Sequence, residues 1–370
     1  MKLIILRGNL KEALQSLERA VTENNNLPIL KNILLKADSR LTLIGTNLEI
    51  AVTYITAGKI TEEGSITIPF TPFYSIINNS SSERINLATS GNTLVVKTDN
   101  YEAKIQGIGA EEFPIIPKIE DQKDILEMDS DILSEAIGQV MHAAQVSAAK
   151  PELNSILFDF QLGLLKLVAT DGFRLAEKTL LNNSFSTTFS KGVRALIPLK
   201  TISEVVRIFP KGKRVVIRLD EHQISFSSDG SELISRLIDG TYPDYTAIIP
   251  KNIATELTVA RDELINAVKL VSNFSGRTSD VKMRLKEGTN ALEVFAANQL
   301  LGENNYLIPV KRKKGNGLNE TAFNWRYLLD GIRPMPSTEI TIGLTSETKP
   351  AVIKPVDDDS LFYIVMPIQA

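Results

Sequence analysis

The stretch Leu153-Asn154-Ser155-Ile156-Leu157-Phe158, followed by Leu165-Lys166-Leu167-Val168-Ala169-Thr170-Asp171, decides the fold because it occurs more than once. Leu30-Lys31-Asn32-Ile33-Leu34-Leu35 and Leu41-Thr42-Leu43-Ile44-Gly45-Thr46-Asn47 carry its Leu-x-x-Ile-Leu and Thr-Asn/Asp signals 123 and 124 residues earlier. A looser third copy follows at residues 281–298. Internal repetition at a fixed period indicates a fold assembled from copies of one unit.

Each copy shows the same order of elements: an amphipathic helix, two strands joined by a turn, a second helix and further strands. The first helices are predicted near Leu10, Leu133 and Leu264, and Asn9 is the predicted N-cap of the first. The second helices are predicted to follow Pro69, Pro198 and Asn324. In the middle copy, the predicted buried stripe of this helix is Ile202, Val205, Val206 and Phe209.

These repeats predict an α+β fold with three similar domains, each with two helices on one face of antiparallel sheets. The predicted domains span residues 1–120, 121–250 and 251–370. Their limits fall in polar stretches, residues 118–123 and 250–255, which are typical of linkers.

The composition resembles that of an ordinary globular protein, with 43% apolar and 23% charged residues and a net charge of −3. The chain has no cysteine, which excludes disulfides, thiolate metal sites and cysteine nucleophiles. The apolar run at residues 3–6 is too short for a signal peptide and is predicted to be an opening strand. No stretch approaches the roughly 20 apolar residues that a membrane-spanning helix needs. A cytoplasmic location is therefore expected.

Four motifs resemble, in order and spacing, those of the bacterial replicative sliding clamp, the β subunit of DNA polymerase III. They are Leu27-Pro28-Ile29-Leu30-Lys31-Asn32, Val168-Ala169-Thr170-Asp171-Gly172-Phe173-Arg174-Leu175-Ala176, Asp239-Gly240-Thr241-Tyr242-Pro243-Asp244-Tyr245 and Tyr363-Ile364-Val365-Met366-Pro367-Ile368. The resemblance implies that the chain is half of a ring: two copies join head to tail, enclose double-stranded DNA without regard to its sequence, and tether a polymerase. It implies no catalytic residue, cofactor or metal.

The resemblance also implies an apolar pocket that receives short Gln- and Leu/Phe-containing peptides from the polymerase III alpha subunit, the clamp loader and repair proteins. The implied pocket residues are Leu153, Thr170, Gly172, Phe173, Arg174, Leu175, Pro243, Ile248, Ile364, Val365, Met366, Pro367 and Ile368. Two residues depart from the family pattern. Phe173 stands where many relatives carry His, and Ala247 stands where some carry Arg. A more apolar pocket is therefore expected. From the residues alone, Asp171-Gly172 is equally a common β-turn signal.

Basic residues gather around the predicted second helix of the middle copy, where Lys200, Arg207 and Lys211 share one stripe with Glu204. For an isolated helix, a solvated face is the better explanation of such a stripe. In a ring whose helices face the hole, the same stripe would face phosphates, and weak, salt-sensitive attraction would suit sliding. The residues expected to face DNA are Lys11, Arg19, Lys150, Lys200, Arg207, Lys211, Lys269 and Arg326.

The resemblance implies that the ring closes by pairing residues 103–108 of one subunit with the third domain of the other, near residues 271–274. The implied interface residues are Ala103, Lys104, Ile105, Gln106, Ile108, Val271 and Phe274. An exposed edge strand favours pairing of this kind.

The remaining charged groups give weak functional signals. The run Lys311-Arg312-Lys313-Lys314 is followed by Gly315 and Gly317, which predicts a flexible loop that is either a solvated hairpin tip or a DNA contact. His142 and His222, the only histidines, lie in different predicted elements and form no catalytic pattern. Asp357-Asp358-Asp359 is predicted to be a solvated turn rather than a metal site.

Two other function classes stay open from the residues alone. An enzyme on a repeated α+β scaffold, acting on a small anionic metabolite, would need a convergent polar cluster in a cleft, and the sequence supplies none with chemical spacing. A peptide-binding scaffold that never meets DNA would need only the pocket.

Overall fold

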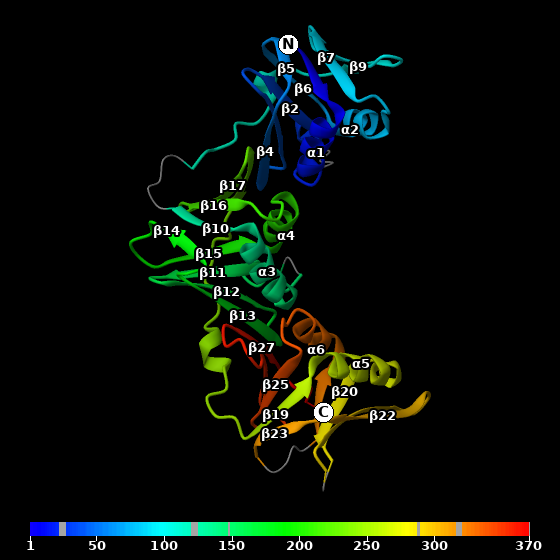
Figure 1. Ribbon diagram of the computed structural model, residues 1–370, viewed down its shortest axis with the longest axis vertical. Helices are drawn as coiled ribbons and strands as arrows, with labels where there is room; N and C mark the ends of the chain where they lie inside the picture. Colours follow the sequence, from blue (N-terminus) through cyan, green and yellow to red (C-terminus); the bar gives the residue numbers. More distant parts are fainter. Residues whose placement is uncertain (22–26, 120–124, 147–148, 287–288, 316–319, 370) are drawn as a thin grey trace. The chain divides into compact units, whose positions relative to one another are not determined.

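The computed structural model describes residues 1–21, 27–119, 125–146, 149–286, 289–315 and 320–369 and is built from short helices and antiparallel strands (Figure 1). It divides into two compact units. The first contains residues 1–131, 185–190 and 203–237, and the second contains residues 132–184, 191–202 and 238–370. Each unit has one nine-stranded sheet and one smaller sheet.

The long sheet of the first unit contains strands from the first two repeats. Its order is β14-β10-β16-β17-β18-β4-β3-β2-β6. Its strands are β2 (Asn32–Ala37), β3 (Leu41–Thr46), β4 (Ile50–Thr56), β6 (Gly64–Pro69), β10 (Ile125–Asp129), β14 (Phe185–Thr187), β16 (Arg214–Leu219), β17 (Gln223–Ser228) and β18 (Ser231–Arg236). β18 pairs antiparallel with β4, with Leu233 opposite Val52, and this pair joins the two repeats into one sheet.

The long sheet of the second unit joins the second and third repeats in the same way. Its order is β15-β11-β12-β13-β27-β26-β25-β19-β23. Its strands are β11 (Ser155–Gln161), β12 (Leu164–Thr170), β13 (Arg174–Leu181), β15 (Val193–Pro198), β19 (Thr255–Ala260), β23 (Lys311–Lys314), β25 (Glu339–Leu344), β26 (Ala351–Pro355) and β27 (Leu361–Val365). Here β13 pairs antiparallel with β27, with Leu175 opposite Ile364.

The two smaller sheets are open and have an edge strand at either end. In the first unit, the order is β5 (Lys59–Glu62), β1 (Lys2–Leu6), β7 (Arg84–Ser90), β8 (Thr93–Lys97) and β9 (Glu102–Gln106). In the second, it is β22 (Gly302–Pro309), β21 (Ala291–Asn298), β20 (Asp280–Leu285) and β24 (Thr321–Asn324). The edge strands of these sheets are β5 and β9 in the first unit and β22 and β24 in the second, so β9 and β22 are among the edges available for pairing with another chain.

Six α-helices lie in the described residues, two in each repeat, as predicted. They are α1 (Arg7–Leu17), α2 (Phe70–Asn79), α3 (Ser130–Val140), α4 (Leu199–Ile208), α5 (Arg261–Val271) and α6 (Trp325–Ile332). Their apolar stripes are buried: Leu10, Leu14 and Leu17 of α1, for example, have no exposed surface. In this part of the chain, no helix is long and apolar enough to span a membrane.

Three local predictions were wrong. The N-cap of α1 is Leu6, and Asn9 lies inside the helix, because the helix continues directly from β1. Val206 is 38% exposed, and Ile208 takes its place in the buried stripe of α4. Leu30 and Lys31 lie in the short 3₁₀ helix η1 (Pro28–Lys31), which Pro28 starts, rather than in the following strand.

The basic run Lys311-Arg312-Lys313-Lys314 is not a flexible loop but the edge strand β23. It pairs with β19, with Arg312 opposite Leu257. Lys311 forms an ion pair with Glu339 at 2.9 Å, and Lys313 lies 3.8 Å from Glu256. Exposed cations on an edge strand oppose pairing with other chains, which gives the run a structural reason. The residues that follow Gly315, 316–319, lie outside the described residues.

The limits of the three predicted domains stay a prediction. The limit at 120/121 lies outside the described residues, and that at 250/251 lies in a stretch without regular structure before β19. The two compact units do not coincide with three repeats because the second repeat supplies strands to both long sheets.

Packing at Gly331 of α6 predicts a clear stability contrast. A methyl group at Gly331 would overlap the ring of Tyr363, whereas one at Gly138 of α3 meets no atom within 4 Å. We expect Gly331→Ala to lower the free energy of unfolding by about 2 kcal/mol through overpacking. Gly138→Ala should raise it by roughly 0.5 kcal/mol, because alanine loses less backbone entropy in a helix. Urea unfolding measures both, and equal stabilities would contradict the close packing of α6 on Tyr363.

Candidate functional site

The turn between β12 and β13 presents Phe173 at its tip. Asp171 Oδ1 accepts hydrogen bonds from the backbone amides of Phe173, at 2.8 Å, and Arg174, at 3.0 Å. Gly172 has a φ of +89°, which favours glycine at this position. The turn predicted from Asp-Gly is therefore present, and it leaves the Phe173 side chain 63% exposed.

The end of the chain is docked against this turn. β27 pairs with β13, and beyond it the Met366 amide donates a hydrogen bond of 2.8 Å to the Phe173 carbonyl. Further on, the Ile368 amide donates to the Ala322 carbonyl at 2.8 Å. The motif at residues 168–176 and the motif at residues 363–368, nearly 200 residues apart in sequence, thus form one surface.

A cleft of 490 Å³ lies on the second unit, where the connector after β18 faces the loop between β25 and β26. Its lining includes Ile248 and Met366, both predicted, and also Ala247. The full lining is Ala247, Ile248, Ile249, Pro250, Lys251, Asn252, Thr345, Thr348, Lys349, Pro350 and Met366. The wall from residues 345–350 was missed, because no motif in that loop distinguishes it from an ordinary turn.

A buried apolar cluster lies beside this cleft. Ile249, which lines the cleft, packs against it, as do Tyr242 and Phe362. The cluster consists of Leu157, Val168, Leu175, Leu196, Tyr245, Val352 and Ile364. Tyr245 lies in the short 3₁₀ helix η4 (Tyr245–Ile248), and burial, assisted by a hydrogen bond to Glu177, raises the pKa of its hydroxyl. The connector that carries Ile248 is therefore fixed to the sheet.

The predicted pocket residues fall into two groups. Exposed or half-buried members can contact a ligand, and they are Gly172, Phe173, Arg174, Pro243, Ile248, Met366 and Ile368. Buried members shape the surface from below, and they are Leu153, Thr170, Leu175, Ile364, Val365 and Pro367. The structure brings both groups together on the second unit.

Arg174 is not a free cation. Its Nε donates to Asp171 Oδ2 at 2.9 Å and its Nη1 donates to Asp330 Oδ2 at 2.6 Å. The guanidinium lies 4.3 Å from the centre of the Tyr327 ring. Sequence reasoning missed Tyr327 and Asp330, because both lie on α6 and resemble ordinary helix residues.

Arg207 was predicted to face DNA, and in the structure its guanidinium bonds to groups of the same chain. Its Nε donates to Glu204 Oε2 at 2.7 Å, and its Nη2 donates to the Ser16 carbonyl at 3.0 Å. Its Nη1 donates to the Gln15 carbonyl. These carbonyls are at the C-terminal end of α1, where helices leave acceptors without partners. Glu204, predicted on the exposed stripe, is only 3% exposed.

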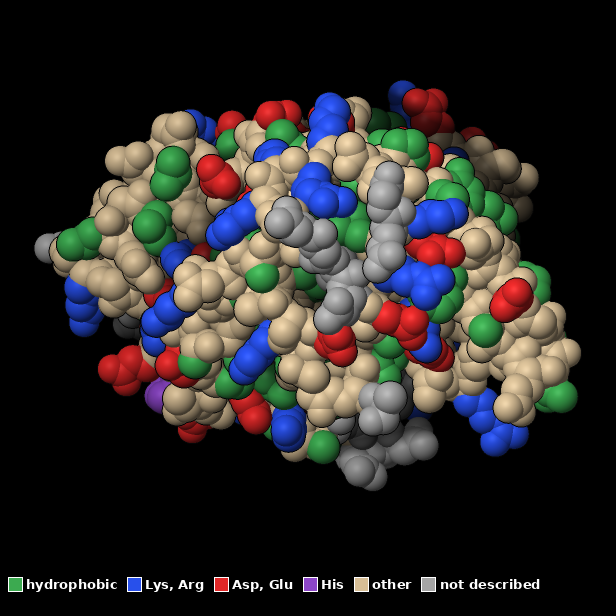
Figure 2. All heavy atoms as spheres, turned by 90° about the horizontal axis from the view of Figure 1, so that it is seen from below, with side chains coloured by type: hydrophobic (Ala, Val, Ile, Leu, Met, Phe, Trp, Pro, Cys, Tyr) green, Lys and Arg blue, Asp and Glu red, His purple; other side chains and the backbone are tan. Residues whose placement is uncertain are grey.

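The other predicted DNA-facing cations are accessible to different degrees. Lys150, Lys200, Lys211, Lys269 and Arg326 are exposed, whereas Lys11 is half-buried. Arg19 is exposed but lies 3.4 Å from Glu204, and Arg326 stacks on the Trp325 ring at 5.1 Å. On the face shown in Figure 2, Lys and Arg side chains lie among Asp and Glu side chains rather than in one basic patch.

The residues predicted at the subunit interface are divided between a sheet edge and a core. Lys104, Gln106 and Ile108 are exposed on or beside the edge strand β9, Ala103 is half-buried, and Ile105 is 7% exposed. Val271 has no exposed surface, because it packs inside the third repeat, and its place in the interface stays a prediction. Phe274 is half-buried in η5 (Ser272–Phe274).

The free edge near Phe274 is β22, which sequence reasoning missed. The Asn304 amide of β22 donates to the Leu270 carbonyl at 3.5 Å, so the strand lies beside the end of α5. Leu307 of β22 is 42% exposed, and Leu300 and Leu301, just before the strand, are 94% and 59% exposed. Polar and apolar residues do not alternate clearly along this strand, because Glu303, Asn304 and Asn305 are consecutive polar residues, and no strand was therefore predicted there.

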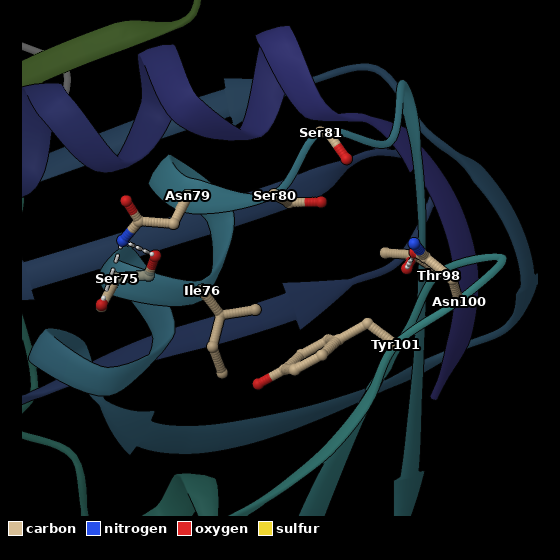
Figure 3. A pocket seen from close by; sticks show the side chains of 8 residues that line it. All are labelled: Ser75, Ile76, Asn79, Ser80, Ser81, Thr98, Asn100 and Tyr101. Carbon is tan, nitrogen blue, oxygen red and sulfur yellow. Dashed lines mark hydrogen bonds between the residues drawn. The ribbon is translucent and has the colours of Figure 1, made fainter.

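A second hollow, of 320 Å³, lies beside β9 in the first unit (Figure 3). Ser75, Ile76 and Asn79 come from α2, and the Asn79 amide donates to the Ser75 carbonyl at 2.8 Å. Ser80 and Ser81 follow that helix, and Thr98, Asn100 and Tyr101 come from the loop that leads into β9. The lining has no acid, base or nucleophile–base pair that would indicate catalysis.

The remaining titratable candidates are structural. Burial, with the nearby charge of Arg174, lowers the pKa of His142 to about 4, so its ring is neutral at neutral pH. Asp358 was predicted in a solvated turn but forms an ion pair of 2.8 Å with Lys178. Within the described ranges, no group of three or more His, Asp or Glu residues is arranged to hold a metal.

Comparison with known proteins gives one consistent result. Family models of the DNA polymerase III beta subunit match residues 1–117 as its N-terminal domain, 127–244 as its central domain and 246–369 as its C-terminal domain. The chain is 28% identical to the beta sliding clamp of Synechococcus elongatus over 379 residues, covering 100% of this chain and 99% of that protein. It is 25% identical to that of Bacillus subtilis over 382 residues, covering 100% of both. Its fold matches the crystal structure of the DNA polymerase III subunit beta from Pseudomonas aeruginosa with a TM-score of 0.93, 25% identity and 100% coverage of both chains.

The position of Arg207 predicts that it matters for stability. Arg207→Met should lower the free energy of unfolding by about 2 kcal/mol, because Glu204 and two helix-end carbonyls lose a charged donor. Lys200→Met and Lys211→Met, at exposed positions around the same helix, should change it by less than about 0.5 kcal/mol. Thermal unfolding measures the three variants. Equal effects would show that Arg207 is an ordinary surface cation.

Proposed function

The chain belongs to the family of the DNA polymerase III beta subunit, and so it is a sliding-clamp processivity factor; we propose that two copies join head to tail into a ring around double-stranded DNA. Each copy would supply three domains, residues 1–120, 121–250 and 251–370. The ring would tether the polymerase by topology, and no bond would be made or broken. Its place of action would be the cytoplasm, at the replication fork.

The observation that carries this proposal is the pattern of sheet pairing. Neighbouring repeats share sheets through β4–β18 and β13–β27, so each repeat junction inside the chain is a continuous ladder. The first repeat keeps a free edge at β9 and the third keeps one at β22. Pairing of β9 with β22 of a second copy would continue the strand pairing of the repeat junctions from one subunit to the next. Head-to-tail contacts of this kind form closed rings when their rotation closes.

The hollow beside β9 supports the proposed subunit contact. It opens between α2 and the loop of residues 98–101, next to the edge strand. Phe274, Leu300 and Leu301 lie in the region of β22 and offer apolar side chains of suitable size. A side chain from the second copy would fill the hollow when the two edges pair.

The pocket around Phe173, Ile248 and Met366 is proposed to bind peptides from the polymerase III alpha subunit, the clamp loader and other clamp-binding proteins. Two observations support this. Apolar side chains line a 490 Å³ cleft, and Ile249 of this lining packs against a buried apolar cluster. Lys251 and Lys349 are the charged residues of its lining, which favours peptides with acidic side chains beside their apolar anchors.

DNA is proposed to be held weakly. The exposed cations Lys150, Lys200, Lys211, Lys269 and Arg326 would face the duplex, with Lys11 and Arg19 adding less. Each neutralised phosphate adds salt-sensitive affinity without reading sequence. A net charge of −3 limits the total attraction, which suits a ring that must move.

Loading on DNA circles tests the ring. We expect protein loaded onto a nicked plasmid by its clamp loader and ATP to co-elute with the plasmid in gel filtration and to be released when the plasmid is cut once. Bulky proteins bound at both ends of the cut DNA should prevent the release. Retention that does not change on linearisation would contradict enclosure and favour a groove binder. Failure to associate with DNA at all would favour the peptide-binding scaffold.

Substitutions at exposed positions test the pocket. Phe173→Asp and Ile248→Asp should each weaken binding of a synthetic Gln- and Leu/Phe-containing peptide by about 10-fold or more, because each removes a substantial part of the apolar contact. Leu162→Asp is a matched control, because Leu162 is 71% exposed in the β11–β12 turn of the same repeat. Fluorescence anisotropy measures the affinities. Equal affinities in all three variants would place the peptide elsewhere.

A further inference from the structure

The polar side chains between β13 and the third repeat form two separate ion pairs. Near the turn, Arg174 bonds to Asp330. Four residues further along the same strand, the Lys178 Nζ donates to Asp358 Oδ2 at 2.8 Å and to Ser360 Oγ at 2.7 Å. Both pairs join the second repeat to the third, and only the first adjoins the turn that presents Phe173.

Arg174 connects the turn to α6. Its Nε and its backbone amide both bond to Asp171, whose Oδ1 also accepts from the Phe173 amide. Its Nη1 reaches across to Asp330. The Arg174 and Asp171 side chains are each 11% exposed, so their hydrogen bond acts largely out of water, where it is stronger. The Asp330 side chain is 37% exposed, so water weakens its bond to Arg174 in part.

Asp330 lies on α6, a helix that is packed firmly against the core of the third repeat. Its helix neighbours Leu328, Leu329 and Ile332 are at most 2% exposed. The Tyr363 hydroxyl of β27 donates to the Tyr327 carbonyl at 2.9 Å, and Gly331 allows the Tyr363 ring to pack directly against α6. Figure 1 shows α6 and β27 within this same unit. The position of the Asp330 carboxylate is therefore fixed by the third repeat.

The charges around Arg174 make Asp330 necessary. Asp171 and Asp330 are the carboxylates that bond to the guanidinium, and the neighbouring His142 is neutral because its pKa is lowered to about 4. Asp171 belongs to the turn itself and moves with it. Asp330 is the one of the two that joins the turn to another element.

We propose that Asp330 is a positioning residue for the peptide pocket: it holds Arg174, and through Arg174 it fixes the turn of residues 170–174 and the Phe173 side chain at its tip. The pocket would then have its binding shape only when the third repeat is docked on β13. This role rests on the proposed function of the pocket as a peptide site, and Asp330 itself need not touch the peptide.

Two variants of Asp330 and one control test this role in the full-length protein. Asp330→Ala removes the acceptor, and Asp330→Asn keeps an acceptor without the charge. Asp358→Ala is the matched control, because it removes the acid of the other ion pair between β13 and the third repeat. Hydrogen exchange followed by mass spectrometry reports on the turn of residues 170–174, and titration with a synthetic Gln- and Leu/Phe-containing peptide reports on binding.

We expect Asp330→Ala to speed exchange in the turn and to weaken peptide binding by about 10-fold, as expected for a lost hydrogen bond between charged groups. Asp330→Asn should lie between it and the wild type. Asp358→Ala should lose a similar amount of thermal stability and change neither readout. A loss of affinity that follows thermal stability across all variants, the control included, would show a merely structural role.

The outcomes separate the two proposals. Wild-type protein that binds no such peptide overturns the pocket itself and the role given to Asp330 with it. Wild-type binding together with unchanged exchange and affinity in Asp330→Ala overturns the positioning role alone.

Discussion

The antiparallel pairing of β13 with β27 is the constraint on which most of the second unit depends. It places residues 174–178 opposite residues 361–365, and it buries Leu175 and Ile364 in one cluster. The backbone hydrogen bonds of the pair hold the end of the chain in place, where termini usually fray. The hydrogen bond from Met366 to Phe173, the packing of Tyr363 on α6 and the bond from Arg174 to Asp330 all require this register. A shift of β27 by one residue would turn the Tyr363 side chain to the other face of the sheet and would break the backbone pairing beside Phe173.

Shared sheets also explain how neighbouring repeats are joined within each unit, because each long sheet contains strands from two repeats. A repeat with two helices covers one side of its sheets and leaves strand edges at both ends. Inside the chain, two pairs of these strands join neighbouring repeats, β4 with β18 and β13 with β27. The edge strand β23 carries four exposed cations, which protect it from pairing. The strands β9 and β22 lack such a run, and this difference between edges agrees with the proposed subunit contact.

The sequence predicted what local periodicity and turn chemistry determine. The repeated patterns predicted all six helices, and turn chemistry predicted the Asp-Gly turn at residues 171–172. The place of the C-terminal motif beside this turn was implied only by the family resemblance. Features that depend on partners distant in sequence were not predicted. Val206 and Ile208 exchange roles, and Arg207 bonds to carbonyls of α1, which lies about 190 residues earlier. The cleft wall at residues 345–350 and the link from Arg174 to Asp330 exist only once β13 and β27 have paired, so no local pattern predicts them.

The partners of the arginines that were predicted to face DNA bear on how a ring could hold DNA and still slide along it. Three of the eight residues predicted to face DNA are arginines, and each has a partner within the chain: Arg207 bonds to Glu204 and α1, Arg19 lies near Glu204, and Arg326 stacks on Trp325. The other five are lysines, whose compact charge on a flexible stem does not form the bidentate contacts with phosphate that arginine forms. A lysine can pass from one phosphate to the next with little cost in geometry, whereas a fixed guanidinium fork would favour particular positions. If the proposed lining is correct, binding by point charges lowers the barrier between successive positions along the duplex. The attraction then keeps the DNA inside the ring without opposing its motion.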